Sequence, residues 1–81
     1  MAIELDIRYL GMLAEKTGCE QEDMRLQAST TVRALRQSLE TRYPELKGMV
    51  YKVAVSQHLA TDDSEINADV EIALLPPFAG G

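Results

Sequence analysis

The chain begins with a strict alternation of hydrophobic and polar residues. Residues 3–9 read Ile-Glu-Leu-Asp-Ile-Arg-Tyr, so every second side chain is apolar. This period is typical of a β-strand with one buried face. The segment 23–28 alternates in the same way as far as Ala28, after a short helical turn that closes at Gly18. We therefore predict two antiparallel strands joined by that turn.

The period changes in residues 29–44. Hydrophobic residues there recur at i, i+3 and i+7, which is the spacing of one face of an α-helix, and they are Val32, Leu35 and Leu39. Thr30 or Thr31 can cap the start of this helix, and Pro44 ends it.

The last third of the chain returns to strand patterns. Residues 51–57 predict a third strand, and residues 70–75 predict a fourth. The segment 58–69 between them is polar apart from Leu59 and Ile66, and we predict a loop there.

The predicted order is strand, strand, helix, strand, strand. A right-handed crossover through the helix places a later strand parallel to an earlier one. The fold that this order favours is α+β: a β-grasp, or ubiquitin-like, fold with a mixed sheet and one main helix packed on one face. We expect residues 1–75 to form this domain and residues 76–81 to form a C-terminal tail.

Composition limits the classes of partner. With 81 residues the chain forms one domain, and its 46% hydrophobic and 26% charged residues are typical of a globular protein. A net charge of −5 disfavours binding to nucleic acid, because the phosphates would be repelled. No apolar run has the roughly 20 residues that span a membrane. A single cysteine and the absence of a signal-peptide core favour a cytoplasmic location.

Few residues outside the tail suggest chemistry. His58 is the only histidine and has no second metal ligand nearby, so we expect a surface residue and no metal site. Cys19 lacks the cationic neighbours that activate a thiol. The acidic residues of the segment 62–65 lack the spacing of a calcium loop and are expected to be solvated; they are Asp62, Asp63 and Glu65. We do not expect an enzyme that acts on its own.

The end of the chain is its most specific feature. Residues 76–81 read Pro-Pro-Phe-Ala-Gly-Gly and directly follow an apolar strand. Pro76 and Pro77 fix φ and would project the tail away from the domain. Gly80 and Gly81 have no Cβ, so the tail can enter a channel that is too narrow for a side chain. The carboxylate of Gly81 could then react with ATP to form an acyl-adenylate, and a nucleophile could displace AMP.

Three leucines lie outside the buried pattern. Leu75 has the opposite phase to the buried residues of its strand, Leu10 follows the first strand, and Leu59 lies in the polar segment. Neighbouring first and last strands would bring Leu10 and Leu75 into one apolar patch, which Leu59 could join. Such a patch indicates a protein partner. Scattered surface leucines or a second small core remain alternatives.

The chain resembles the family of molybdopterin synthase small subunits, which are ubiquitin-like sulfur carriers. The similar stretches are residues 7–18, 30–39, 53–60 and 70–81, and the last of these, with its Pro-Pro-x-x-Gly-Gly ending, is the most specific. The sequence departs from the family's usual residues at four places, namely Ala14, Ser56, Asp69-Val70-Glu71 and Phe78.

This resemblance implies a role for each part of the tail. An ATP-dependent activating enzyme would adenylate Gly81 and convert it to a thiocarboxylate, so ATP is used by the partner and no cofactor binds stably to this chain. Gly80 would let the tail, which includes Phe78 and Ala79, enter the large synthase subunit. That subunit would supply the catalytic side chains, while the sulfur moves onto cyclic pyranopterin monophosphate. The implied assembly is a heterotetramer in which Leu10, Leu59 and Leu75 contact the partner.

Two other functions remain open. The chain could carry sulfur for a thiazole or for tRNA thiolation, or it could modify proteins as ubiquitin does. It could also be a β-grasp binding module whose tail has no role.

Overall fold

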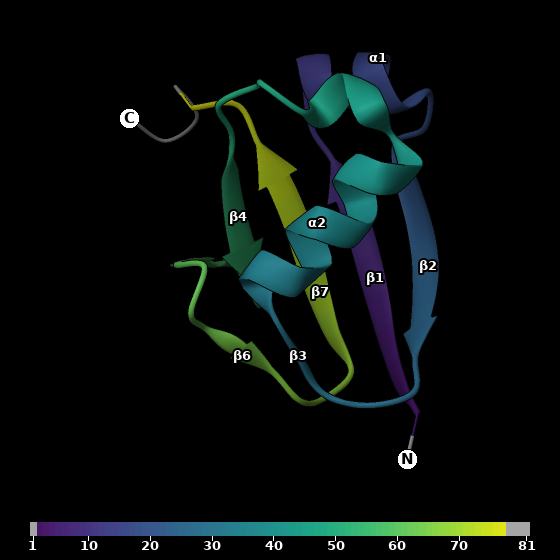
Figure 1. Ribbon diagram of the computed structural model, residues 1–81, viewed down its shortest axis with the longest axis vertical. Helices are drawn as coiled ribbons and strands as arrows, with labels where there is room; N and C mark the ends of the chain where they lie inside the picture. Colours follow the sequence, from purple (N-terminus) through teal and green to yellow (C-terminus); the bar gives the residue numbers. More distant parts are fainter. Residues whose placement is uncertain (1, 78–81) are drawn as a thin grey trace.

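The computed structural model describes residues 2–77 of the chain. The strands and helices, in chain order, are β1 (Ile3–Tyr9), α1 (Met12–Thr17), β2 (Gln21–Leu26), β3 (Thr30–Thr31), α2 (Val32–Arg42), the 3₁₀ helix η1 (Pro44–Leu46), β4 (Lys52–Val55), β5 (His58–Ala60), β6 (Glu65–Ile66) and β7 (Val70–Leu75). Figure 1 shows α2 crossing in front of the sheet.

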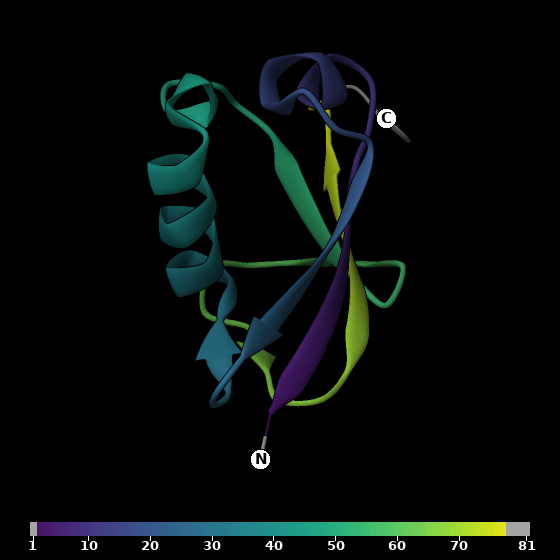
Figure 2. The ribbon, with the colours of Figure 1, turned by 90° about the vertical axis from the view of Figure 1, so that its right-hand side faces the viewer.

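Five of the strands form one mixed sheet in the order β2-β1-β7-β4-β5. Strands β1 and β7 are parallel, and the other neighbouring pairs are antiparallel. The side view in Figure 2 shows α2 on one face of the sheet and α1 at the end where β1 and β7 finish. This arrangement is the predicted β-grasp fold, and the other face of the sheet carries no helix from the described residues.

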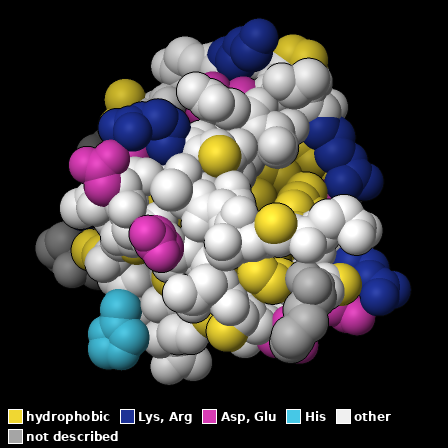
Figure 3. All heavy atoms as spheres, turned by 60° about the horizontal axis from the view of Figure 1, so that its bottom comes forward, with side chains coloured by type: hydrophobic (Ala, Val, Ile, Leu, Met, Phe, Trp, Pro, Cys, Tyr) yellow, Lys and Arg dark blue, Asp and Glu magenta, His cyan; other side chains and the backbone are white. Residues whose placement is uncertain are grey.

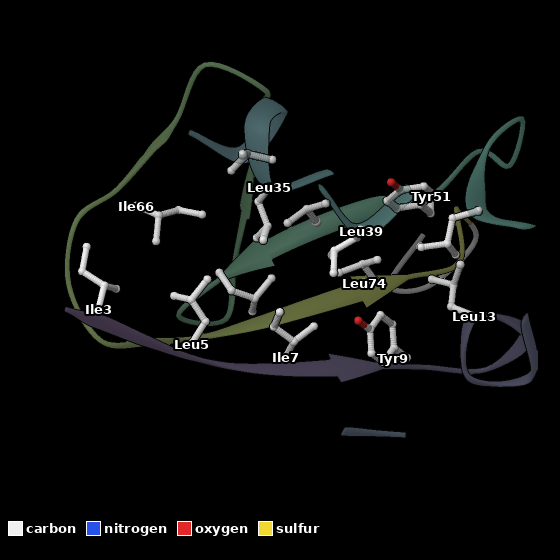
Figure 4. Close-up of a cluster of buried hydrophobic side chains, with 14 residues drawn as sticks. Ile3, Leu5, Ile7, Tyr9, Leu13, Leu35, Leu39, Tyr51, Ile66 and Leu74 are labelled. Atoms are coloured by element: carbon white, nitrogen blue, oxygen red, sulfur yellow. The ribbon is translucent and has the colours of Figure 1, made fainter. Parts of the chain in front are cut away.

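The core lies between α2 and the sheet. The alternating residues predicted to be buried in the first strand, Ile3, Leu5, Ile7 and Tyr9, are buried there. They meet Leu35 and Leu39 from the helix and Leu74 from the last strand, as Figure 4 shows. In the last strand Ile72 and Leu74 are fully buried and Val70 packs against the core from its partly buried position.

The main helix begins and ends at the residues that the sequence predicted. Thr31 is the cap: its Oγ1 accepts a hydrogen bond from the backbone N–H of Ala34 at 3.2 Å. Arg42 is the last helical residue, and Pro44 then opens the 3₁₀ turn η1. The strand predicted at 23–28 spans Gln21–Leu26 instead, and Ala28 lies beyond it and is exposed.

The predicted loop at 58–69 is wrong in part, because it contains β5 and β6. The chain turns back at Ser56 and Gln57, whose φ values of 51° and 69° allow a two-residue hairpin turn, and β5 then pairs with β4. Strand β6 pairs with β3, which buries Ile66 to 1% exposure at one end of the core. Burial of that isoleucine gives this polar segment a fixed place.

A partly buried polar cluster joins β1, β2 and the end of α2. The carboxylate of Glu22 accepts hydrogen bonds from the hydroxyls of Tyr9 at 2.5 Å and Tyr43 at 2.7 Å. Its other oxygen lies 2.8 Å from the guanidinium of Arg42. Burial and the hydrogen bond to Glu22 raise the pKa of both tyrosine hydroxyls, that of Tyr43 to about 12. The two tyrosine hydroxyls thus donate to the same carboxylate oxygen, which links the end of α2 to β1 and β2.

Candidate functional site

The candidate site begins where β7 leaves the sheet. Strand β7 ends at Leu75, and the half-buried Pro76 and Pro77 follow it beside the β1–α1 turn. Of the predicted tail 76–81, the residues Phe78, Ala79, Gly80 and Gly81 lie outside the described part of the chain. The domain boundary after residue 75 and the roles of these four residues therefore stay predictions.

The β1–α1 turn packs against the start of the tail. The backbone N–H of Leu10 donates to the carbonyl of Leu74 at 3.1 Å, which extends the β1–β7 pairing one residue past β1. Gly11 follows with φ 59° and ψ −132°, and α1 starts after it. A Cβ placed on Gly11 would lie 3.1 Å from Cγ of Pro76, so the proline ring occupies the space that the missing side chain leaves.

On the open face of the sheet, opposite α2, a row of apolar residues crosses β7, β4 and β5, and Lys52 of β4 and Glu71 of β7 flank it. The register places Ala73 beside Ala54, and Ala54 beside Leu59, in one row across these strands. Leu75 lies next along β7, and Leu10 lies beside it because Tyr9 pairs with Leu74. We call Leu10, Ala54, Leu59, Ala73 and Leu75 the apolar patch.

All three leucines predicted to contact a partner belong to this patch. Leu10 is 43% exposed and Leu59 is 63% exposed, whereas Leu75 is half-buried. Sequence reasoning missed Ala54 and Ala73, because a small apolar residue gives a weak signal. Their alternation with Val53, Val55 and Ile72 was the one available sign that they lie on the opposite face.

The other half of the open face, on β1 and β2, is charged. Arg8 lies 3.1 Å from Asp6 and 3.2 Å from Glu71, and Gln21 donates to Asp6 at 2.8 Å. The hydrogen bonds from Gln21 and Arg8 lower the pKa of the Asp6 carboxyl. A hollow of about 500 Å³ lies at the end of this half, lined by residues that include Leu10, Gly11 and Glu15.

The surroundings of the other residues considered for chemistry do not indicate a catalytic or metal-binding role. The side chain of His58 is exposed at the periphery of the molecule, as expected (Figure 3). The thiol of Cys19 is half-buried near Thr17 and Glu22. Residues 2–77 contain no group of three or more His, Cys, Asp or Glu side chains that could hold a metal ion, and none of their helices has the length and apolar character to cross a membrane.

The acidic segment 62–65 is mostly solvated, as predicted: Asp63 and Glu65 are exposed, and of the acidic residues only Asp62 is half-buried, beside α2. The carboxylate of Asp62 lies 2.7 Å from the guanidinium of Arg36, and that of Asp63 lies 3.1 Å from Arg33. The hydrogen bond to the Tyr51 hydroxyl and the hydrogen bond to Asp62 raise the pKa of Arg36. The pair with Asp62, together with backbone hydrogen bonds from Val32 to Ser64 and from Arg33 to Asp62 at 3.0 Å, ties the β5–β6 loop to the start of the helix.

The departures from the usual residues of the resembled family have local effects. Ser56 occupies a position with positive φ, and Asp69 accepts a hydrogen bond from the backbone N–H of Glu4 at 2.9 Å. The turn before β7 is thus tied to the start of β1. Ala14 packs against the core from α1.

Known proteins share both the sequence pattern and the fold. The chain matches the sequence model of the ThiS family over residues 7–81. A molybdopterin synthase sulfur carrier subunit from Caenorhabditis briggsae is 29% identical over 83 residues, which cover 98% of this chain and 99% of that protein.

Two solved structures show the same fold at lower identity. A putative molybdopterin converting factor, subunit 1, from Pyrococcus furiosus has a TM-score of 0.85 at 19% identity, covering 93% of this chain and 98% of that one. SAMP1 from Haloferax volcanii has a TM-score of 0.79 at 22% identity, covering 96% of this chain and 99% of that one.

Proposed function

The chain belongs to the ThiS family, and we propose from this that it is a sulfur carrier, the small subunit of a molybdopterin synthase. The observation that carries the proposal is that the family match runs through the last residue, so it includes the Pro-Pro-Phe-Ala-Gly-Gly segment. The similarity to a named sulfur carrier subunit over nearly the whole of both chains supports it.

The proposed chemistry takes place at the carboxylate of Gly81. A partner enzyme joins this carboxylate to the α-phosphate of ATP and releases pyrophosphate, which leaves an acyl-adenylate. A hydrosulfide ion then attacks the carbonyl carbon and displaces AMP, and loss of its proton leaves a thiocarboxylate. The thiocarboxylate sulfur then bonds to cyclic pyranopterin monophosphate in the large subunit, and water cleaves the acyl–sulfur bond, which releases the tail as a carboxylate. ATP and the catalytic side chains belong to the partners, and this chain keeps no cofactor of its own.

Residues of this chain orient the tail and allow it to enter the partner. Two consecutive prolines restrict the backbone where the tail leaves β7, which reduces the conformational entropy that the partner must remove on binding. Gly80 adds no Cβ to the part of the tail that enters the partner. The described surface contributes the apolar patch, which lies on the strand that leads to the tail and would dock on the large subunit of a cytoplasmic heterotetramer.

The direct test is mass spectrometry of the protein purified from its own cells. We expect a fraction in which one sulfur replaces one oxygen at the C-terminal glycine, located by fragmentation of the C-terminal peptide. A purely unmodified terminus in cells that actively make molybdenum cofactor would contradict the proposal. An isopeptide bond between Gly81 and a lysine would point to a protein modifier instead, and co-purification of a thiazole or tRNA enzyme would point to another sulfur pathway.

Three variants separate the role of the tail from the stability of the fold. Deleting Gly81, or adding one residue after it, should abolish adenylation, and Gly80→Val should reduce both adenylation and sulfur delivery sharply. We expect the melting temperature of each variant to match that of the unchanged protein, because no core residue is altered. Adenylation of a C-terminally extended carrier would show that the tail carboxylate is not the reactive group.

A further inference from the structure

The contact between Gly11 and Pro76 assigns a role to a residue far from the tail in sequence. We propose that Gly11 is a positioning residue: it leaves the space in which the Pro76 ring sits, and thereby sets the direction in which the remaining tail leaves the domain. This inference rests on the proposed function, because direction matters only if the tail enters a partner.

Two separate features of the structure require glycine at position 11. Its φ of 59° and ψ of −132° are the mirror image of extended backbone, a conformation that residues with a Cβ rarely adopt. An added Cβ would also lie 3.1 Å from Cγ and 3.9 Å from Cδ of Pro76. The first requirement concerns the turn alone, whereas the second concerns the tail.

The surroundings hold both partners of this contact in place. Gly11 follows directly on the hydrogen bond from Leu10 to Leu74, and its carbonyl accepts the N–H of Ala14 at 3.0 Å in the first turn of α1. Pro76 is half-buried and follows β7, whose residues Ile72 and Leu74 are fully buried. The ring therefore rests on a turn that these hydrogen bonds hold in place.

A small shift of the ring has a large effect at the reactive end. The five residues 77–81 reach at most roughly 17 Å when extended. A tilt of about 10° at the base of such an arm moves its tip by about 3 Å, and a misplacement of only 1 Å at a reacting centre can cost about 10²-fold in rate. We expect Gly11→Ala to lower kcat/KM for adenylation about 10-fold or more. The loss should appear chiefly in kcat, since the carboxylate would lie misplaced against ATP in the bound complex.

Gly18→Ala is the matched control. Gly18 ends α1 with φ 80°, so alanine is strained there too, but no atom lies within 4 Å of its added Cβ. Both variants should melt below the unchanged protein, and only Gly11→Ala should impair adenylation at a temperature where both are folded. Activity is measured as ATP–pyrophosphate exchange by the adenylating enzyme that co-purifies with the unchanged carrier. Equal kcat/KM values for the two variants would overturn the proposal.

A double variant tests whether the ring is the cause. Replacing Pro76 by alanine removes Cγ and Cδ, the two atoms that the new methyl group approaches. Gly11→Ala should therefore cost less than about 3-fold in a Pro76→Ala background, compared with about 10-fold alone. Losses that simply multiply would show that Gly11 acts only through the turn, and would overturn the role in aiming the tail.

A measurement on the free protein separates this inference from the proposed function. We expect a nuclear Overhauser effect between the α-protons of Gly11 and the ring protons of Pro76, weakened in Gly11→Ala and retained in Gly18→Ala. Its absence from the unchanged protein would overturn the inference, whatever the activity. Its presence in a protein that no adenylating enzyme accepts would instead overturn the proposed function alone.

Discussion

The opposite phases of Leu74 and Leu75 allow one strand to test core and surface separately. Leu74 is 0% exposed and lies in the core, whereas Leu75 lies on the open face. Truncating a buried leucine to alanine costs about 3–5 kcal/mol, and a buried carboxylate adds to that. A domain of 81 residues has a total stability of about 4–12 kcal/mol. Leu74→Asp should therefore leave little or no folded protein at 25 °C.

Leu75→Asp should have a much smaller effect on the free domain. Leu75 is only half-buried, so its replacement loses part of the about 1.5–3 kcal/mol that a fully buried leucine contributes. Its cross-strand neighbour is Lys52, and an opposite-charge pair at such a position contributes about 0.2–1 kcal/mol. The net loss should be at most about 1 kcal/mol, which corresponds to roughly 4–8 °C in melting temperature for a domain of this size.

The matched control is Leu75→Lys, which removes the same leucine and places a like charge opposite Lys52. We expect this variant to melt below Leu75→Asp, and the difference to shrink in high salt. Circular dichroism melts at low and high salt measure both effects. Equal melting temperatures for the two variants would show that Lys52 does not face this position. An unfolded Leu75→Asp together with a folded Leu74→Asp would mean that the assigned phase of β7 is reversed.

The same variants also separate docking from stability. Central interface residues commonly cost about 2 kcal/mol or more on truncation, which is roughly a 30-fold loss of affinity. Leu75→Asp should therefore weaken binding of the large synthase subunit by about 30-fold or more in a calorimetric titration, even though it stays folded. Unchanged affinity would remove the apolar patch from the proposed interface.

Three further changes have defined outcomes. Ser56→Asn should stabilise the domain by about 0.5 kcal/mol, because asparagine tolerates the positive φ of 51° better, and a lower midpoint in urea would contradict this. Thr31→Ala should cost about 1 kcal/mol by removing the cap of α2, whereas Thr31→Ser, which keeps the hydroxyl, should cost little. Burial and the hydrogen bond to Glu40 raise the pKa of Tyr51 to about 12 from its usual value near 10. The stability that this protonated hydroxyl contributes is complete below pH 10 and is lost as the pH rises through 12. Tyr51→Phe should therefore show a shallower fall in urea midpoint across this window, and an unchanged slope would contradict the assignment.

The elements that the sequence predicts correctly are those whose period is repeated. Strands β1 and β7 have seven and six residues, and α2 has eleven, so each shows its buried face several times. Strands β5 and β6 have three and two residues, too few to show any period. Their places depend on contacts between residues far apart in the sequence, such as the pairing of Thr30 with Ile66. The local hydrophobic pattern carries no information about such contacts.

The candidate site likewise has contacts that the sequence predicts and contacts that it does not. The proximity of Leu10 and Leu75 was predicted from the neighbouring first and last strands of a β-grasp fold, and the register of β1 and β7 confirms it. The contact between Gly11 and Pro76 depends on the position of one ring against one turn, which no spacing indicates. The ion pair between Arg36 and Asp62 joins residues 26 positions apart, so the local sequence did not indicate it.

Strand β7 links three requirements of the proposed sulfur carrier: docking on the partner, orienting the tail and inserting the tail into the partner. Its outward residues Ala73 and Leu75 belong to the apolar patch, its inward residues are locked in the core, and its end leads to Pro76. A partner bound on the patch therefore meets a tail whose base is fixed relative to the bound surface. Under the proposed function, changes at Leu75 should alter the affinity for the large subunit. Changes at Gly11 should alter the direction in which the tail leaves the domain, and changes at Gly80 should alter entry of the tail into the partner's active site. The first two effects are separable from the stability of the fold because Leu75 and Gly11 lie outside the hydrophobic core cluster.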